Sequence, residues 1–160
     1  MKNKILIAVD ESKNAMKAVE HVGNILGTGV QITLFHVLPK APAKGIETEK
    51  ILVGHHLVFK EGVVDFREWL KQKRAAIEQV MDKARALLIK SGLESKNIQI
   101  KIQQWKKGVA RDILSELRAG KYDTVVMGRR GLSGTKAFFA GSVSNKIIQH
   151  AKNCGVWVVE

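Results

Sequence analysis

The chain has 160 residues, 45% of them hydrophobic, so it has the length of one domain and enough apolar surface for a core without disulfides. Its single cysteine excludes an internal disulfide and a Cys-x-x-Cys metal cluster. The formal net charge of +12 favours anionic partners, but the 27 Lys and Arg residues are scattered along the chain, as on a solvated basic surface.

The N-terminus does not have the pattern of a signal peptide. Its apolar run covers only Ile5 to Val9, and Asp10 ends the run without a small-residue cleavage site. No stretch approaches the roughly 18 consecutive apolar residues of a membrane span. We therefore expect a cytoplasmic protein without a membrane partner.

The first elements in chain order are a strand, a helix and a strand. Residues 4–9 form a continuous apolar run, typical of a strand buried on both faces of a parallel sheet. Apolar residues in 10–26 follow helical spacing, and Ser12 suits the N-cap. Residues 30–38 are rich in β-branched and aromatic side chains and predict a second strand.

The pattern breaks in residues 39–65, which hold both prolines of the chain. The apolar part of this segment has no clean period, so a short helix and an excursion over the surface both stay open. His55 and His56 are adjacent, and because neighbouring side chains diverge we do not expect them to bind a metal.

The second half alternates helices with strands. A long amphipathic helix is expected over 66–92, and alternating isoleucines in 97–105 predict a strand near a sheet edge. The remaining elements are predicted as a helix over 108–120, a buried strand over 122–128, a helix over 141–153 and a last strand over 155–160.

This alternation predicts an α/β fold with a five-stranded parallel sheet and helices on both faces. In strand order 3-2-1-4-5 the ends of the first and fourth strands flank the switch point, where such sheets bind ligands. Asp10 and Gly128 come at those two ends. We expect one domain over residues 1–160, with an extended variable segment at about 39–65.

The glycine-rich stretch 128–146 favours an anion. It fails the Walker A pattern, because Lys136 does not directly follow a glycine, and it also fails the dinucleotide fingerprint. Its glycines nevertheless permit close backbone approach, and Gly141 with Ser142 opens a helix whose free N–H groups attract negative charge. These features are equally typical of a simple turn and an N-cap, so the residues alone leave phosphate binding open.

The stretch also carries a family pattern. Gly128, Gly131, Gly141 and Ser142 match the spacing G-x2-G-x9-G-[ST], and the segments ILIAVDES, LFHV, GVARDIL, DTVVMGRRG and GSVSNKII run over nearly the whole chain. On these motifs the chain resembles the universal stress protein family, on its ATP-binding branch. The resemblance implies a Rossmann-like fold of the adenine nucleotide alpha hydrolase type.

The resemblance also implies ATP in the cleft, with Mg²⁺ or Mn²⁺ held through phosphate oxygens. Asp10 would accept a hydrogen bond from the base or ribose, and the Val37 backbone would meet the adenine edge. The other implied contacts to ribose and phosphates are Gly128, Gly131, Gly141, Ser142 and Val143. Ser144 would add a hydroxyl donor, and Arg129 a positive field.

The last strand is where many family members pair edge to edge, so the resemblance implies a homodimer through Val156, Trp157 and Val158. The family's usual proline after the cysteine is missing here, where Gly155 follows Cys154. Trp157 would either add apolar area to that interface or pack on the core.

The expected function is nucleotide-dependent, in a stress or signalling role, with weak or no ATP hydrolysis. No residue presents itself as catalytic, so the chain would be at most a slow ATPase. The alternatives are a non-catalytic regulatory module with an empty cleft and a basic protein associated with nucleic acid. We do not expect the last, because no basic stripe interleaved with aromatic residues is present.

Overall fold

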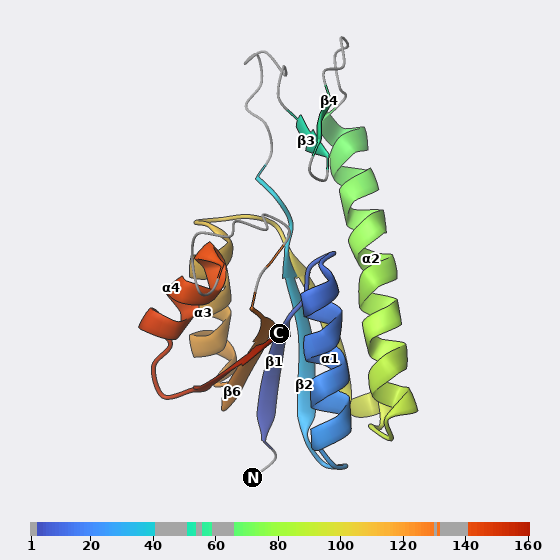
Figure 1. Cartoon of the computed structure of the whole chain (residues 1–160), viewed down its shortest axis with the longest axis vertical. Coiled ribbons are helices and arrows are strands. Elements are labelled where there is room, and N and C mark those ends of the chain that lie inside the picture. Colours follow the sequence, from blue (N-terminus) through green and yellow to red (C-terminus); the bar gives the residue numbers. More distant parts are fainter. Residues whose placement is uncertain (1–2, 41–50, 54–55, 59–65, 130, 132–140) are drawn as a thin grey trace.

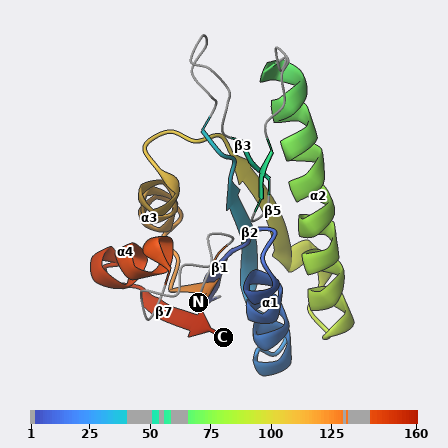
Figure 2. The same cartoon turned by 45° about the horizontal axis from the view of Figure 1, so that its top comes forward.

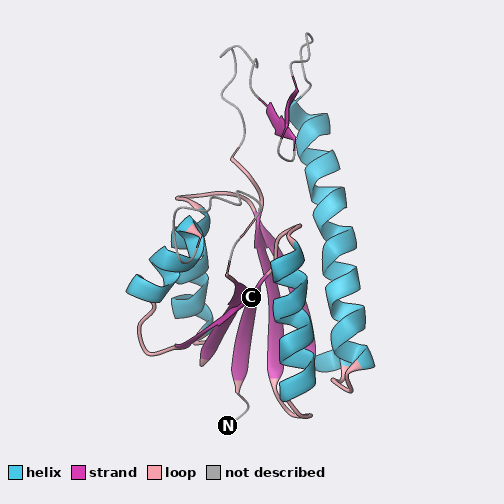
Figure 3. Ribbon diagram, in the orientation of Figure 1, coloured by secondary structure: helices cyan, strands magenta, loops and turns pink. Residues whose placement is uncertain are grey.

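The computed structural model describes residues 3–40, 51–53, 56–58, 66–129, 131 and 141–160. Its centre is a parallel sheet of five strands in the order β5-β2-β1-β6-β7 (Figures 1 and 3). In chain order this is 3-2-1-4-5, which confirms the predicted topology. The strands are β1 (Lys4–Ala8), β2 (Gln31–Val37), β5 (Ile98–Gln103), β6 (Thr124–Gly128) and β7 (Gly155–Val159).

Helices cover both faces of the sheet, as predicted. On one face lie α1 (Lys13–Ile25) and α2 (Phe66–Lys90), and on the other lie α3 (Val109–Gly120) and α4 (Ser142–His150) (Figure 1). Each face has its own hydrophobic core: Leu34, Met81 and Leu88 are fully buried on the first, and Leu6, Val125 and Ile147 on the second.

Local signals place the ends of several elements where the sequence predicts them. Ser12 is the N-cap of α1, and its hydroxyl accepts a hydrogen bond of 3.2 Å from the Ala15 N–H. The alternating strand β5 lies at one edge of the sheet, with a short 3-10 helix over Ser95–Asn97 before it. Within the described residues, no helix is long and apolar enough to cross a membrane.

The described part of the segment at 39–65 contains strands rather than a short helix. Its described residues include two short strands, β3 (Ile51–Val53) and β4 (His56–Val58), which pair antiparallel. Figures 1 and 2 show this pair beside the N-terminal end of α2, toward the carboxyl ends of the main-sheet strands. Three-residue strands carry too few side chains for a period of two to be recognised, which explains why the sequence pattern missed them. His55 lies outside the described residues.

Candidate functional site

A cavity of about 450 Å³ lies at the carboxyl ends of the central strands. Its wall includes the ends of β1, β2 and β6 together with the first turn of α4, so it sits at the switch point of the sheet. Eight of the nine predicted site residues line it: Asp10, Val37, Gly128, Gly131, Gly141, Ser142, Val143 and Ser144. The topology therefore brings together residues that are more than 100 positions apart.

Asp10 is held by the turn between β1 and α1. Its Oδ1 atom accepts a hydrogen bond of 2.9 Å from the Ser12 N–H, while Ser12 caps the helix with its own side chain. This Asx turn fixes the carboxylate at the end of β1. Asp10 itself does not cap α1, because Ser12 has that role.

Two glycines lie in close contact with neighbouring residues at the cleft. A Cβ atom on Gly128 would lie 2.7 Å from the carbonyl carbon of Asn14, which is backbone and cannot move aside cheaply. A Cβ atom on Gly131 would lie 2.8 Å from Oδ2 of Asp10. Gly128 therefore lets β6 end against the start of α1, and Gly131 lies directly against the Asp10 carboxylate.

The start of α4 supplies the donors at the other side of the cavity. Gly141 is the N-cap, with its N–H donating to the Arg129 carbonyl at 2.9 Å, and the buried Ser144 donates from its hydroxyl to the Gly128 carbonyl at 3.2 Å. These bonds tie the helix start to the end of β6. The N–H groups of Ser142, Val143 and Ser144 form the first turn and have no partner within the helix. Such a turn is suited to an anion.

Arg129 is the predicted site residue that lies elsewhere. It is not among the described residues of the cavity wall, and its guanidinium pairs with the Glu160 carboxylate. Its backbone N–H also donates to the Val159 carbonyl at 2.6 Å. Arg129 thus joins the end of β6 to the end of β7, and its charge is partly neutralised there.

The cavity also contains residues that the sequence pattern did not select. His36 from β2 and Trp69 and Lys73 from α2 line its wall. The two α2 residues are four positions apart, so they share one face of that helix. Helical spacing could show this pairing, but it could not show that the N-terminal end of α2 reaches the cleft.

His36 has a defined orientation. Its Nδ1 atom lies 2.7 Å from the Val9 carbonyl oxygen, and because a carbonyl only accepts, Nδ1 is the protonated nitrogen. Burial lowers the pKa of His36 below its usual 6.5, outweighing this bond and the nearby Asp10 and Glu11 carboxylates, which raise it. The ring is therefore neutral near pH 7.

Comparison with known proteins shows the family of this chain. The model of the universal stress protein family matches residues 1–160. The chain belongs to the universal stress protein family. It is 25% identical over 160 residues to universal stress protein YxiE of Bacillus subtilis (strain 168), with 99% of each chain covered.

Solved structures share the fold. Universal stress protein UspA from Lactobacillus plantarum superposes with a TM-score of 0.69 at 17% identity, covering 99% of this chain and 97% of that one. A family protein from Arabidopsis thaliana with AMP bound gives a TM-score of 0.61 at 15% identity, covering 98% and 90%. A universal stress protein in complex with cAMP gives 0.62 at 16%, covering 99% and 96%.

Proposed function

We propose that this universal stress protein binds ATP, or a closely related adenine nucleotide, in the carboxyl-end cavity, and that occupancy serves a stress or signalling role. The observation that carries the proposal is the convergence of Asp10, Val37, the three spaced glycines and the α4 start on one cavity. The relatives with AMP and cAMP support the choice of adenine.

The phosphates would lie at the start of α4. Three adjacent N–H groups, the positive end of the helix dipole and the exposed Ser142 hydroxyl provide donors there without a dedicated cation. Gly128 and Gly131 allow the backbone to approach the ribose and first phosphate. Asp10, already fixed by the Ser12 N–H, would accept from a ribose hydroxyl or the base.

A divalent cation would be held chiefly by the phosphate oxygens. Within the described part of the chain, no three His, Cys, Asp or Glu side chains gather in a metal-binding group. Mg²⁺ commonly binds through substrate phosphates and one or two carboxylates. We propose that hydrolysis is weak or absent, which a phosphate-release assay over hours would check.

Gly141→Val tests the proposed site. Gly141 has φ −62° and ψ 163°, which valine also adopts, so the substitution adds bulk at the phosphate position without forcing the backbone. We expect saturable ATP binding by the wild type in calorimetry and none by the variant. Gly27→Ala, where a Cβ atom meets nothing within 4 Å, is the matched control and should bind as the wild type does. No saturable binding by the wild type would refute the proposal.

We further propose a cytoplasmic, single-domain protein that dimerises through β7. That strand lies at the edge of the sheet opposite β5, and Val158 on it is exposed. Trp157 packs on the core and meets the His21 ring edge-on at 6.3 Å. The Trp157 side chain therefore already has contacts within one protomer, and Val156 and Val158 lie on either side of it in the strand. Val158→Lys should shift the mass measured by light scattering from dimer to monomer, and an unchanged mass would argue against this interface.

A further inference from the structure

His36 interrupts the hydrogen-bond pattern between β1 and β2. Along β2, Gln31 donates its N–H to the Asn3 carbonyl, and the Phe35 carbonyl accepts from the Val9 N–H, each at 2.9 Å. Odd-numbered residues of β2 therefore direct their backbone groups toward β1. Leu38 instead donates to the Gln103 carbonyl of β5, so even-numbered residues face the other way.

Val37 is the next residue in this series. Continuation of the ladder would pair its N–H with the Val9 carbonyl, but that oxygen already accepts from Nδ1 of His36 at 2.7 Å. The Val37 N–H and carbonyl have no partner among the described residues, and Val37 lines the cavity. A donor and an acceptor thus stand side by side where β1 ends. Unpaired backbone groups are uncommon and expensive in a protein interior, so they indicate a place that a ligand completes.

We propose that His36 is a positioning residue that sets base specificity: by occupying the Val9 carbonyl it keeps the Val37 N–H and carbonyl available to read the edge of adenine. The inference rests on the proposed nucleotide site and goes beyond it by assigning selectivity to a side chain that does not itself need to touch the base.

The chemistry of the bases explains the selectivity. On either edge adenine presents a ring-nitrogen acceptor beside the donating N6 amino group, which matches the Val37 N–H and carbonyl. Guanine in the same pose presents O6 in place of the amino group, so two acceptors face each other. A site built to pair with a donor rejects the analogue that lacks it more strongly than an apolar pocket does. The neutral state of the buried ring keeps Nδ1–H as the donor to Val9.

The test compares ATP with 1-deaza-ATP and 7-deaza-ATP, which lack the acceptor on one edge or the other. Losing one hydrogen bond should weaken wild-type binding of one analogue by roughly five- to tenfold. His36→Phe frees the Val9 carbonyl to take the Val37 N–H. This variant should bind ATP roughly five- to tenfold more weakly than the wild type does. It should also bind the deaza analogue that the wild type disfavours no more weakly than it binds ATP. His36→Asn, whose amide can donate to Val9, should restore the wild-type preference.

Hydrogen exchange of the wild type gives a readout that needs no variant. The Val37 amide should exchange faster than the Phe35 amide in the nucleotide-free protein and become protected when ATP is added. A protected Val37 amide without nucleotide would overturn the inference, as would an unchanged analogue preference in His36→Phe or equal wild-type binding of ATP and both analogues. In each case ATP binding itself would stand. Absence of ATP binding by the wild type would instead refute the proposed function and this inference with it.

Discussion

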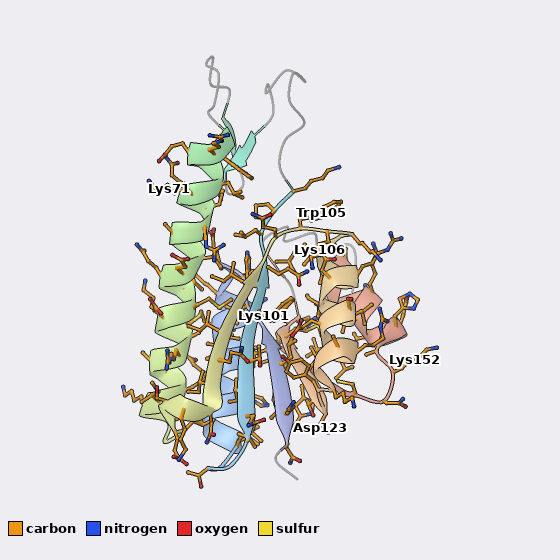
Figure 4. All side chains as sticks on the ribbon, turned by 180° about the vertical axis from the view of Figure 1, so that it is seen from behind. Lys71, Lys101, Trp105, Lys106, Asp123 and Lys152 are labelled. Carbon is orange, nitrogen blue, oxygen red and sulfur yellow. The ribbon has the colours of Figure 1, made fainter. Side chains whose placement is uncertain are left out.

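The two ends of the parallel sheet both carry a cavity, but the polar groups at the two ends are used in opposite ways. At the amino end a cavity of about 300 Å³ is lined by residues that include Lys4, Thr33, Lys96 and Tyr122. At the carboxyl end lies the larger cavity of about 450 Å³ described above. Figure 4 shows the two ends of the sheet: Asp123 lies at the amino end, and Trp105 and Lys106 lie at the carboxyl end.

At the amino end the polar groups pair with one another. The Tyr122 hydroxyl lies 3.1 Å from both Thr33 Oγ1 and Glu116 Oε1, and the other oxygen of Glu116 accepts from Lys101 Nζ at 2.6 Å. Burial raises the pKa of Tyr122, so its hydroxyl stays protonated. Asp123 in turn accepts from the Lys4 N–H at 2.7 Å.

At the carboxyl end the backbone groups stay available. The Val37 N–H and carbonyl and the first N–H groups of α4 lack partners within the described structure, and the glycines keep side chains out of the way. A cavity with polar groups in its wall is therefore by itself a poor guide to binding. The useful distinction is whether its donors and acceptors are already satisfied.

The largest expected effect comes from Gly128→Ala, which disturbs the carboxyl end through packing. The new methyl group would lie 2.7 to 2.8 Å from Asn14 backbone atoms, so β6 and α1 must separate. We expect a loss of about 1–3 kcal/mol in the free energy of unfolding, together with weaker ATP binding. Urea unfolding measures the loss, and an unchanged midpoint would contradict the close contact.

Tyr122→Phe should lower the stability of the fold without affecting the carboxyl-end cavity. It removes the hydroxyl that bridges Thr33 and Glu116, leaving buried partners incompletely paired. We expect a cost of about 1–2 kcal/mol in the free energy of unfolding, with the affinity for ATP unchanged. A marked fall in ATP affinity would mean that the amino-end network is coupled to the cleft.

Acidification should lower the free energy of unfolding by a smaller amount, through His36 at the carboxyl end. His36 has a folded-state pKa lowered by burial, so below pH 6.5 the unfolded chain binds more protons than the folded one. The free energy of unfolding should therefore decrease as the pH falls from 7 toward 5. His36→Asn does not titrate and should lose less over the same range in urea unfolding. If the wild type and His36→Asn lost the same free energy of unfolding, the lowered pKa of His36 would be contradicted.

Most of the fold was predictable because the signals were local and consistent. Continuous apolar runs marked β1 and β6, helical spacing marked α1 and α2, and alternating isoleucines marked the edge strand β5. The β3–β4 pair was not predictable, since its two strands have three residues each.

For the candidate site, the sequence pattern selected Gly128 and Gly141, and the structure places both in the cavity wall. Arg129 shows the limit: its charge suggested phosphate, but its guanidinium pairs with Glu160 at the end of β7, a partner that only the topology reveals. His36 and Trp69 were missed for the same reason, because their place in the cavity depends on tertiary packing.

On the proposal above, the nucleotide binds at the carboxyl end of the sheet through backbone groups that lack partners within the described structure. Titrating ¹⁵N-labelled wild type with ATP and following backbone amides tests it most directly. We predict saturable chemical-shift changes of the Val37, Ser142, Val143 and Ser144 amides. The chemical shifts of the Thr33, Glu116 and Tyr122 amides should not change. Shifts confined to the amino-end residues, or no saturable shift of the α4 amides, would contradict it.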